Sequence, residues 1–448
     1  MTNINKEHEI GCACCKNKLP FEMPDDILEA CKNGNLIIFA GAGISTEGKG
    51  FFPFSFYDDI KDELKFKKDI SFPELMTRYT EKTKDKRTLL NKIKERIDYA
   101  KSFPDLYRSI TEFHRELSTI YQIKEIITTN WDTFFEDECG AIPIVANSDF
   151  AFWDQPLRKV FKIHGSINNP GSIIATEEDY KKCYINLNKG IVGASLKHLL
   201  ATKTIVFFGY SFRDYDFNRI YRYLEKDMKD ILPHAYLVAL NDSPIEKKFK
   251  RLPTIIKTDA TYFIQVLKEK LIEDKQLIPD LFYDLVVLRL SEIYKVHFKL
   301  TKGNIKKNPQ LIFCLSYQDG IIHAFERMIQ LKNTGRYSHV CFLKESVDSY
   351  FKIRKKFNKA RRYFDVAYID GYIYGLLNLV PINKTILRGD SYYYIFGYGI
   401  VDSLKKYNKL EKKSYDFHRA AYKWAQNESK KYTDKIILQH TPFLMGVD

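Results

Sequence analysis

Long apolar runs and cysteine are both scarce in this chain of 448 residues. No run is long enough to cross a bilayer, so we expect no membrane-spanning helix. Only Cys12, Cys14 and Cys15 cluster among eight cysteines, which argues against a disulfide framework and favours reduced thiols in a soluble, cytoplasmic protein. These three could hold a metal ion with Cys31, but Cys-x-Cys-Cys lacks the paired spacing of zinc sites, and no metal is predicted.

The chain is also not composed of charges of one sign, because 57 acidic residues are mixed among 71 basic ones, although the net charge is +14. Nucleic acid is a possible partner of such a chain, but a solvated, lysine-rich surface explains the excess better. The basic run at 352–363 leaves the same two alternatives open. It could contact phosphates together with its aromatic residues, or form a solvated helix face, and we favour the second.

The length exceeds what one ordinary hydrophobic core fills, so we expect two domains, or three small ones. Short apolar runs alternate with helical patterns in the first part, as in a Rossmann-like, doubly wound parallel sheet. These runs lie at 36–40, 125–129, 142–145, 160–163, 204–208 and 235–240. The region between the first two runs, from about residue 57 to 121, is predicted to be a helical insertion.

The second part of the chain is predicted to be a separate domain. A polar stretch at 299–309 contains glycine and proline, as linkers do. Beyond it, 311–315 is expected to be a strand, 321–331 a helix and 391–396 another strand. The predicted organisation is therefore an N-terminal arm at 1–24, an α/β domain at 25–275, a helix and linker at 276–310, and an α/β or α+β domain at 311–448.

The first apolar run ends abruptly in Gly41-Ala-Gly-Ile-Ser45. A strand that leads into glycines can bring its backbone close to a pyrophosphate, whose charge is favoured by exposed amides. The third glycine of the dinucleotide fingerprint is missing, because position 46 is a threonine. Alone, this loop therefore fits an ordinary tight turn as well as a nucleotide site.

Polar or glycine residues also follow three later runs: Thr128-Thr-Asn-Trp-Asp132, His164-Gly165 and Gly209-Tyr-Ser211. Ligands of open α/β sheets bind at the carboxyl ends of the strands. In this order the four motifs resemble the sirtuin (Sir2) family, whose signature is Gly-Ala-Gly-x-Ser, Thr-x-Asn-x-Asp, His-Gly and Gly-x-Ser. The resemblance covers roughly 34–273 and implies a domain that binds NAD and breaks its bond between nicotinamide and ribose.

The resemblance also implies roles for individual residues. Asn130 would hydrogen-bond a ribose hydroxyl or the attacking water, and His164 would be the general base. Asp132 would brace the Asn130 loop or face nicotinamide. Each has an ordinary alternative, because His164 could be a core histidine and Asp132 could cap the helix that begins near Thr133.

The dinucleotide itself would be bound by residues from all of the loops. Those on the pyrophosphate side are Gly41, Ala42, Gly43 and Ser45, the last of which could instead be only a helix cap. Those on the adenosine side are Gly209, Ser211, Asn241 at the adenine ribose, and Asp259 where the family closes its adenine pocket.

Two features of the deacetylating sirtuins are missing. Their Gly-Ile-Pro-Asp-Phe-Arg run is replaced by Thr46-Glu-Gly-Lys-Gly-Phe-Phe-Pro53, which has neither that aspartate nor that arginine. Only Cys183 lies where deacetylases carry two Cys-x-x-Cys pairs, and one thiol cannot form a four-ligand zinc site. Water, rather than acetyl-lysine, is therefore the expected acceptor.

A zinc-free sirtuin core with a helical insertion and a separate C-terminal domain resembles the bacterial anti-phage sirtuins, which destroy NAD when infection is sensed. The resemblance implies an NAD⁺ hydrolase that releases nicotinamide and ADP-ribose and is gated by its C-terminal domain, by a partner defence protein or by homo-oligomerisation. Two alternatives stay open. One is a non-catalytic subunit that senses NAD or ADP-ribose beside an Argonaute-like or other nuclease, and the other is an NAD-dependent protein deacetylase.

Overall fold

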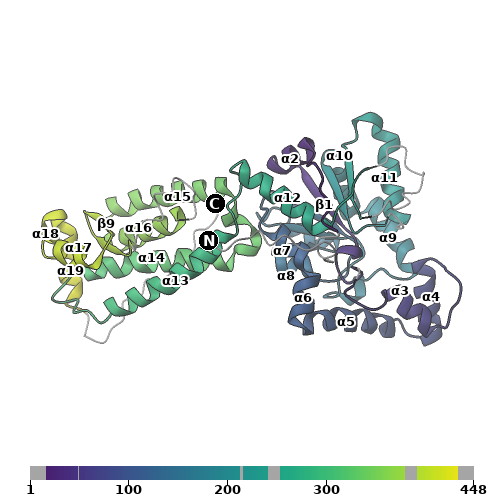
Figure 1. Ribbon diagram of the computed structural model, residues 1–448, viewed down its shortest axis with the longest axis horizontal. Coiled ribbons are helices and arrows are strands. Elements are labelled where there is room, and N and C mark those ends of the chain that lie inside the picture. Colours follow the sequence, from purple (N-terminus) through teal and green to yellow (C-terminus); the bar gives the residue numbers. More distant parts are fainter. Residues whose placement is uncertain (1–16, 49, 212–214, 241–252, 379–390, 432–448) are drawn as a thin grey trace. The chain divides into compact units, whose positions relative to one another are not determined.

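The computed structural model describes residues 17–48, 50–211, 215–240, 253–378 and 391–431 (Figure 1). The chain divides into two compact units, Met1–Asp274 and Lys275–Asp448. Within the described ranges, no helix has both the length and the apolar character needed to cross a membrane.

The first unit is built on a seven-stranded sheet in which every pairing is parallel. Its order is β3-β4-β2-β1-β5-β6-β7, which confirms the predicted doubly wound sheet. The strands are β1 (Leu36–Ala40), β2 (Glu125–Thr128), β3 (Ile142–Ile144), β4 (Lys159–Lys162), β5 (Thr204–Phe208), β6 (Ala235–Val238) and β7 (Thr254–Ile256).

The topological switch point of the sheet lies between β1 and β5. The strands β2, β4 and β3 follow on one side of β1, and β5, β6 and β7 follow on the other. All five residues of β1 are buried, as expected for a strand that is covered on both faces. The loops that leave β1 and β5 therefore meet where ligands bind in this class of fold.

Helices cover both faces of the sheet (Figure 1). Successive strand residues point to opposite faces. Phe207 packs against Tyr221 of α11, whereas Phe208 packs against Phe113 of α7 and Phe263 of α12. The helices are α2 (Asp25–Lys32), α3 (Phe56–Glu63), α4 (Phe72–Thr83), α5 (Lys86–Ser102), α6 (Pro104–Ile110), α7 (Glu112–Ser118), α8 (Phe134–Cys139), α9 (Glu177–Lys189), α10 (Ile191–Thr202), α11 (Tyr215–Met228) and α12 (Ala260–Glu273), with short 3-10 turns η1 (Ala42–Ile44), η2 (Asn147–Phe152), η3 (Pro170–Ser172) and η4 (Lys229–Ile231).

Helices α3 to α7 lie in the predicted insertion between β1 and β2. Three of them begin at a side chain that accepts a hydrogen bond from a backbone amide of the first turn, namely Ser55 for α3, Ser71 for α4 and Asp85 for α5. Their apolar faces form a separate small core. Trp131, from the loop after β2, packs against that core, so the insertion is joined to the carboxyl edge of the sheet.

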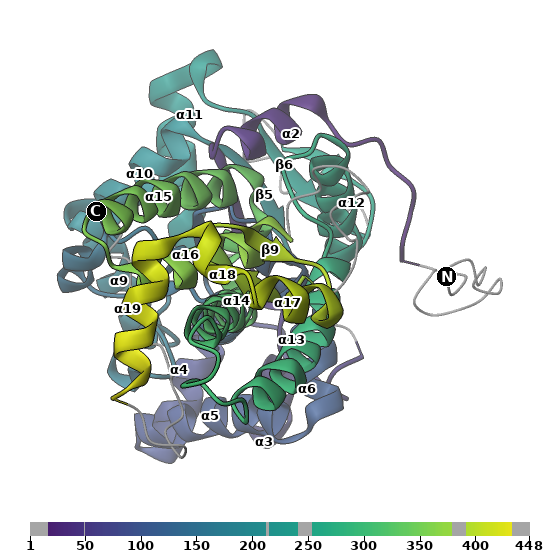
Figure 2. The ribbon, with the colours of Figure 1, turned by 90° about the vertical axis from the view of Figure 1, so that its left-hand side faces the viewer.

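The second unit is largely helical and contains a small antiparallel hairpin. Figure 2 shows α14 surrounded by other helices of this unit. The elements are α13 (Leu281–Leu300), α14 (Leu311–Gln330), η5 (Lys332–Thr334), η6 (Arg336–Ser338), α15 (Val340–Lys359), α16 (Tyr363–Leu377), β8 (Tyr393–Ile395), β9 (Gly399–Val401), α17 (Leu404–Glu411), α18 (Ser414–Phe417) and α19 (Arg419–Ser429). The hairpin contains the strand expected at 391–396, and the polar stretch at 299–309 begins in the last turn of α13 and continues toward α14.

The strand predicted at 311–315 is wrong, because these residues are the first turns of α14. A short, fully apolar run cannot distinguish a buried strand from a buried helix. Here α14 is buried on all sides, and α16 approaches it so closely that a Cβ atom at Gly320 would lie 2.0 Å from the carbonyl oxygen of Tyr368. The helix predicted at 321–331 is the remainder of α14.

Candidate functional site

Two of the four motifs touch each other through their glycines. The Gly43 amide donates to the carbonyl oxygen of Gly209 at 3.1 Å, and the Gly41 amide donates to that of Phe208 at 2.9 Å. A Cβ atom at Gly41 would lie 2.4 Å from the Gly209 oxygen, and Gly209 itself has a φ of +57°. Both loops therefore require glycine, because the backbone after β1 and the backbone after β5 lie in direct contact.

The second motif, Thr128–Asp132, is held against the Gly41–Ser45 motif by Asp132. Ser45 donates its hydroxyl to Asp132 Oδ2 at 2.5 Å, and both side chains are buried. The other carboxylate oxygen accepts from the Phe134 amide at 3.1 Å, at the start of α8. Asp132 thus braces the loop and caps the helix at the same time, and Ser45 is bound to it across 87 positions of sequence.

Asn130 lies between these contacts, with its side chain buried. Its Nδ2 donates to the carbonyl oxygen of Gly41 at 3.1 Å, and its backbone amide donates to Thr128 Oγ1 at 3.0 Å. Its Oδ1 is buried and has no hydrogen-bond partner among the described residues. Because an unsatisfied buried acceptor costs about 1–3 kcal/mol, this oxygen is placed to accept a hydrogen bond from a ligand or from water.

The third motif, His164-Gly165, follows β4. The His164 ring is buried and meets the ring of Tyr180 edge-on, with 5.0 Å between the centroids. Gly165 has a φ of +84°. The loop after it contacts the Thr128–Asp132 motif, because the Ile167 amide donates to the Trp131 carbonyl oxygen at 2.8 Å. The backbone of all four motifs is therefore linked at one edge of the sheet.

A family model described as a SIR2-like domain matches residues 124–267. The curated relatives include Defense-associated sirtuin 2 of Bacillus subtilis, which is 23% identical over 50% of this chain and 22% of its own length. NAD(+) hydrolase ThsA of Enterococcus faecium is 32% identical over 43% of this chain and 40% of its own. The same-named protein of Bacillus cereus (strain MSX-D12) is 26% identical over 54% and 49%.

This chain contains a SIR2-like domain. It is distantly related to the defence-associated sirtuin and to the ThsA proteins, which confirms the predicted resemblance. The matches span less than half the length of each of these relatives. A solved Sir2 enzyme structure aligns with 56% of this chain and 99% of its own, at 13% identity and a TM-score of 0.29.

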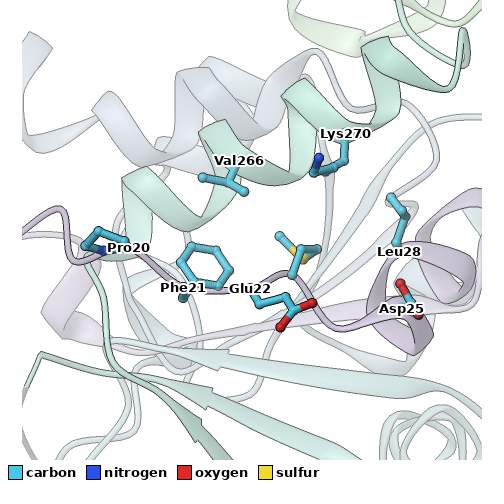
Figure 3. Close-up of a pocket in the computed structure, with 8 residues that line it drawn as sticks. Pro20, Phe21, Glu22, Asp25, Leu28, Val266 and Lys270 are labelled. Atoms are coloured by element: carbon cyan, nitrogen blue, oxygen red, sulfur yellow. The ribbon is translucent and has the colours of Figure 1, made fainter.

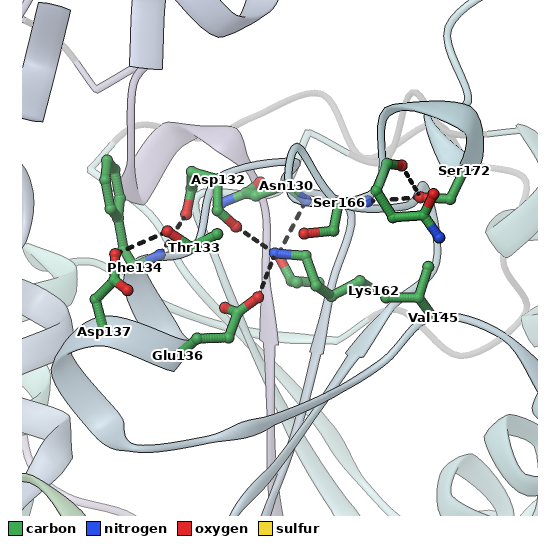
Figure 4. Close-up of polar contacts among 12 residues, drawn as sticks. Asn130, Asp132, Thr133, Phe134, Glu136, Asp137, Val145, Lys162, Ser166 and Ser172 are labelled. Atoms are coloured by element: carbon green, nitrogen blue, oxygen red, sulfur yellow. Dashed lines mark hydrogen bonds and ion pairs between the residues drawn. The ribbon is translucent and has the colours of Figure 1, made fainter. Parts of the chain in front are cut away.

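The SIR2-like domain also contains a buried ion pair that the sequence reasoning missed. Lys162, the last residue of β4, contacts the carbonyl oxygen of Asp132 and lies 3.1 Å from Glu136 Oε1 (Figure 4). Burial raises the pKa of Glu136, and the nearby Lys162 charge acts in the opposite direction. A lysine inside the run Val160-Phe-Lys-Ile163 was the available signal, because a strand that is covered on both faces rarely contains a charge.

A second buried titratable group lies behind the Asn130 loop of the SIR2-like domain. His114, on α7, is fully buried, and its ring centroid lies 4.5 Å from that of Phe135. Burial lowers its pKa to about 4, while the charge of Asp132 raises it and that of Lys162 lowers it further. Its imidazole is therefore neutral at pH 7 and packs as part of the core.

The other residues that the sequence predicted for the site lie in separate parts of the first unit or outside the described residues. Ala42 lies in the turn η1, and Ser211 is exposed at the end of a described segment. Asp259 caps α12, with Oδ1 accepting from the Thr261 amide at 2.8 Å and the Tyr262 amide at 3.1 Å. Asn241 and the cysteines at 12, 14 and 15 lie outside the described residues. Within the described ranges, no group of three or more histidine, cysteine, aspartate or glutamate side chains is arranged to hold a metal ion.

A cavity of about 720 Å³ lies on another part of the first unit, between the N-terminal arm, α2 and α12 (Figure 3). None of the predicted site residues lines it. Its lining residues are Pro20, Phe21, Glu22, Met23, Asp25, Leu28, Val266 and Lys270.

Proposed function

We propose that this protein is an NAD⁺ hydrolase that cleaves the bond between nicotinamide and ribose and releases nicotinamide and ADP-ribose. The observation that carries the proposal is the buried Asn130 Oδ1 near the switch point of the sheet, which has no hydrogen-bond partner in the part of the chain that the structure describes. Its neighbours are the glycine loop after β1 and the braced loop that holds Asp132. The relatives named NAD(+) hydrolase support the same reaction.

In this proposal the dinucleotide lies across the carboxyl edge of β1 and β5. The Gly41–Ser45 loop would hold the pyrophosphate, and Gly209 and Ser211 would line the adenosine side. Asn130 Oδ1 would accept a hydrogen bond from a ribose hydroxyl or from the attacking water. Since its Nδ2 is bound to the Gly41 carbonyl oxygen, the orientation of the amide is already fixed before the substrate arrives.

The reaction needs few groups, because nicotinamide is already a cationic leaving group. The C1′–N bond breaks with both electrons moving to the nicotinamide nitrogen, and the ribose becomes oxocarbenium-like. A water oxygen then bonds to C1′ and gives a proton to His164 as general base. The protein mainly positions NAD and excludes other water. General base catalysis typically raises the rate by a further factor of about 10²–10⁴.

The test is to incubate the purified protein with NAD⁺ and to measure nicotinamide and ADP-ribose by chromatography. We expect His164→Ala and Asn130→Ala to lose at least about 10²-fold in turnover while keeping the wild-type melting temperature within a few degrees. Undiminished turnover in His164→Ala would remove that residue from the mechanism. Tight NAD binding without turnover under every condition would favour a sensing subunit, and nicotinamide release that requires an acetylated peptide would favour a deacetylase.

We further propose that the activity serves defence against phage and is silent until infection, since continuous NAD loss would harm the cell that makes the enzyme. The relative named Defense-associated sirtuin 2 supports this role. The second unit, self-assembly or a partner protein would act as the switch. Comparing NAD cleavage by protein purified from infected and from uninfected cells, together with whatever co-purifies, tests this step.

A further inference from the structure

A buried cation joins the strand that leads to His164 with the loop that carries Asn130. The Lys162 side chain is 1% exposed, and its two oxygen contacts, the Asp132 carbonyl and Glu136 Oε1, both belong to the segment after β2 (Figure 4). His164 follows Lys162 by two residues, and Asn130 precedes Asp132 by two. The ammonium group therefore connects the strand that leads to His164 with the loop that carries Asn130.

Stability does not explain why a lysine occupies this position. Burying a charge is costly, and a buried ion pair can often be replaced by well-packed apolar residues without loss of stability. An apolar residue would also continue the run of β4. What an apolar residue cannot supply is a donor that reaches a backbone carbonyl oxygen on a neighbouring loop.

Lys162 completes the restraint of Asp132. The carboxylate of Asp132 is fixed by the Ser45 hydroxyl and the Phe134 amide, and its carbonyl oxygen is fixed by Lys162. Glu136, on α8, lies 3.1 Å from the same ammonium group through its Oε1. With Asp132 restrained at three atoms, the backbone that leads from Asn130 has little freedom to rotate its amide away from the Gly41 carbonyl oxygen.

We propose that Lys162 is a positioning residue that sets the relative placement of Asn130 and His164. For catalysis this inference rests on the proposed NAD⁺ hydrolysis, but its structural part does not. A group held about 1 Å away from its productive position can cost about 10²-fold in rate, whereas substrate binding through other loops is affected less. Lys162 thus acts on turnover more than on the affinity for NAD.

Two lysines of the same domain serve as matched controls. Lys159 lies on the same strand at the end away from the site, is also buried, and donates to the Gln155 carbonyl oxygen at 2.6 Å. Lys268 on α12 forms a largely buried ion pair with Glu116 on α7 at 2.6 Å. Lys159→Met repeats the substitution within β4, and Lys268→Met breaks a comparable ion pair elsewhere.

The experiment compares the full-length variants Lys162→Met, Lys162→Arg, Lys159→Met and Lys268→Met. We expect Lys162→Met to lower kcat for NAD⁺ cleavage about 10²-fold with KM changed less than about threefold, and Lys162→Arg to recover part of kcat. Both controls should keep kcat within about threefold of the wild type. Equal losses of kcat in the two controls would overturn the proposal, as would wild-type kcat in Lys162→Met.

Hydrogen exchange separates this inference from the proposed function. The Asn130 and Phe134 amides should exchange faster in Lys162→Met than in the wild type and in Lys159→Met, whether or not NAD⁺ is cleaved. Faster exchange without any wild-type turnover would reject the hydrolase and keep the positioning role. Unchanged exchange would reject the positioning role. If Lys162→Met does not fold, Lys162→Arg decides, because a folded protein with unchanged kcat and unchanged exchange would contradict the proposal.

Discussion

The two units use glycine in the same way but for different ends. In the first unit, Gly41 and Gly209 bring two loops into backbone contact at the polar edge of the sheet. In the second unit, Gly320 and Gly371 bring α14 and α16 into backbone contact inside an apolar core, and a Cβ atom at Gly371 would lie 1.8 Å from the Tyr317 carbonyl oxygen. A glycine that permits close approach therefore does not indicate a nucleotide site by itself.

Buried polar side chains make the difference between the two regions. In the second unit Asp370 accepts from Arg354 Nη2 at 3.0 Å and from the Tyr394 hydroxyl at 2.8 Å, so its contacts tie two helices to the hairpin. In the first unit both carboxylate oxygens of Asp132 also accept hydrogen bonds. Oδ1 of the nearby Asn130, in contrast, has no partner among the described residues. Tyr407 and Glu411 of the second unit also have buried polar atoms without a partner among the described residues, so the open acceptor of Asn130 indicates a site because it lies at the carboxyl edge of the parallel sheet.

The largest expected effect concerns the helix crossing. Gly371→Ala should lower the free energy of unfolding of the second unit by about 3 kcal/mol or more, because the added carbon meets backbone that cannot move aside. At Gly375, on the same helix, the nearest atom to an added carbon is the Ala324 Cβ at 2.7 Å and the nearest backbone atom is the Ile321 carbonyl oxygen at 3.6 Å, so Gly375→Ala should cost less. Denaturation followed by the fluorescence of Trp424, the tryptophan of this unit, measures both. Equal costs would show that the helices can separate freely.

At the edge of the sheet, Gly41→Ala is the substitution that corresponds to Gly371→Ala. It should abolish NAD⁺ cleavage and lower the free energy of unfolding of the first unit by about 1–3 kcal/mol. The reason is the 2.4 Å approach of the new carbon to the Gly209 oxygen. Unfolding is followed by Trp131 and Trp153, and cleavage by nicotinamide release. A fully active Gly41→Ala protein would contradict the close packing of these two loops.

Burial of His114 should make the free energy of unfolding of the first unit depend on pH, by up to about 3 kcal/mol. Its pKa is lowered to about 4 by burial, so between about pH 6.5 and pH 4 the unfolded chain binds a proton that the folded chain does not. The free energy of unfolding of the first unit should therefore fall as the pH falls through this window. His114→Phe, in a site already lined by Phe113, Phe134 and Phe135, should flatten the dependence. Denaturant titrations at pH 7 and pH 5 measure it, and an equal slope in both proteins would rule out His114 as the cause.

Sequence patterns could predict the arrangement of the first unit because parallel strands place their carboxyl ends on one edge. Knowing four strand ends was enough to expect Gly41, Asn130, His164 and Gly209 together. The Ser45–Asp132 bond and the contact of Gly41 with Gly209 join residues far apart in the chain, and no local pattern encodes them. Lys162 was hidden for another reason, since its partners are a carbonyl oxygen and a glutamate on other segments.

The second unit was harder to predict because its central helix has no polar face. In α14, burial on all sides removes the 3.6-residue periodicity by which an amphipathic helix is recognised. Gly320 and the polar residues Ser316 and Gln318 inside it made the run look short, so 311–315 resembled a strand. Their roles, such as the 2.8 Å bond from Gln318 Nε2 to the Tyr392 carbonyl oxygen, depend on the folded hairpin.

The two carboxylates that brace the units should differ in what their loss affects. Asp132→Ala and Asp370→Ala each leave buried donors without an acceptor, so each should cost about 1–3 kcal/mol of stability in its own unit. Only Asp132→Ala should also lower NAD⁺ cleavage beyond what its stability loss explains, because it frees the Asn130 loop. Cleavage is measured well below the melting temperature of each variant. A comparable direct loss in Asp370→Ala would mean that the helical unit shapes the site.

The smallest effect is expected on the basic face of α15. Arg354 is bound to Asp370, whereas Lys355, Lys356 and Lys359 are exposed. Replacing Lys355 and Lys356 together by alanine should change the free energy of unfolding by less than about 0.5 kcal/mol, whereas Arg354→Ala should cost more. The same double variant should bind single-stranded nucleic acid no differently from the wild type at physiological salt, because a solvated face has no phosphate to lose. A clear, salt-dependent drop in binding would instead make this face a phosphate-binding surface, and the second unit would then have a polar site of its own to set beside the sheet edge.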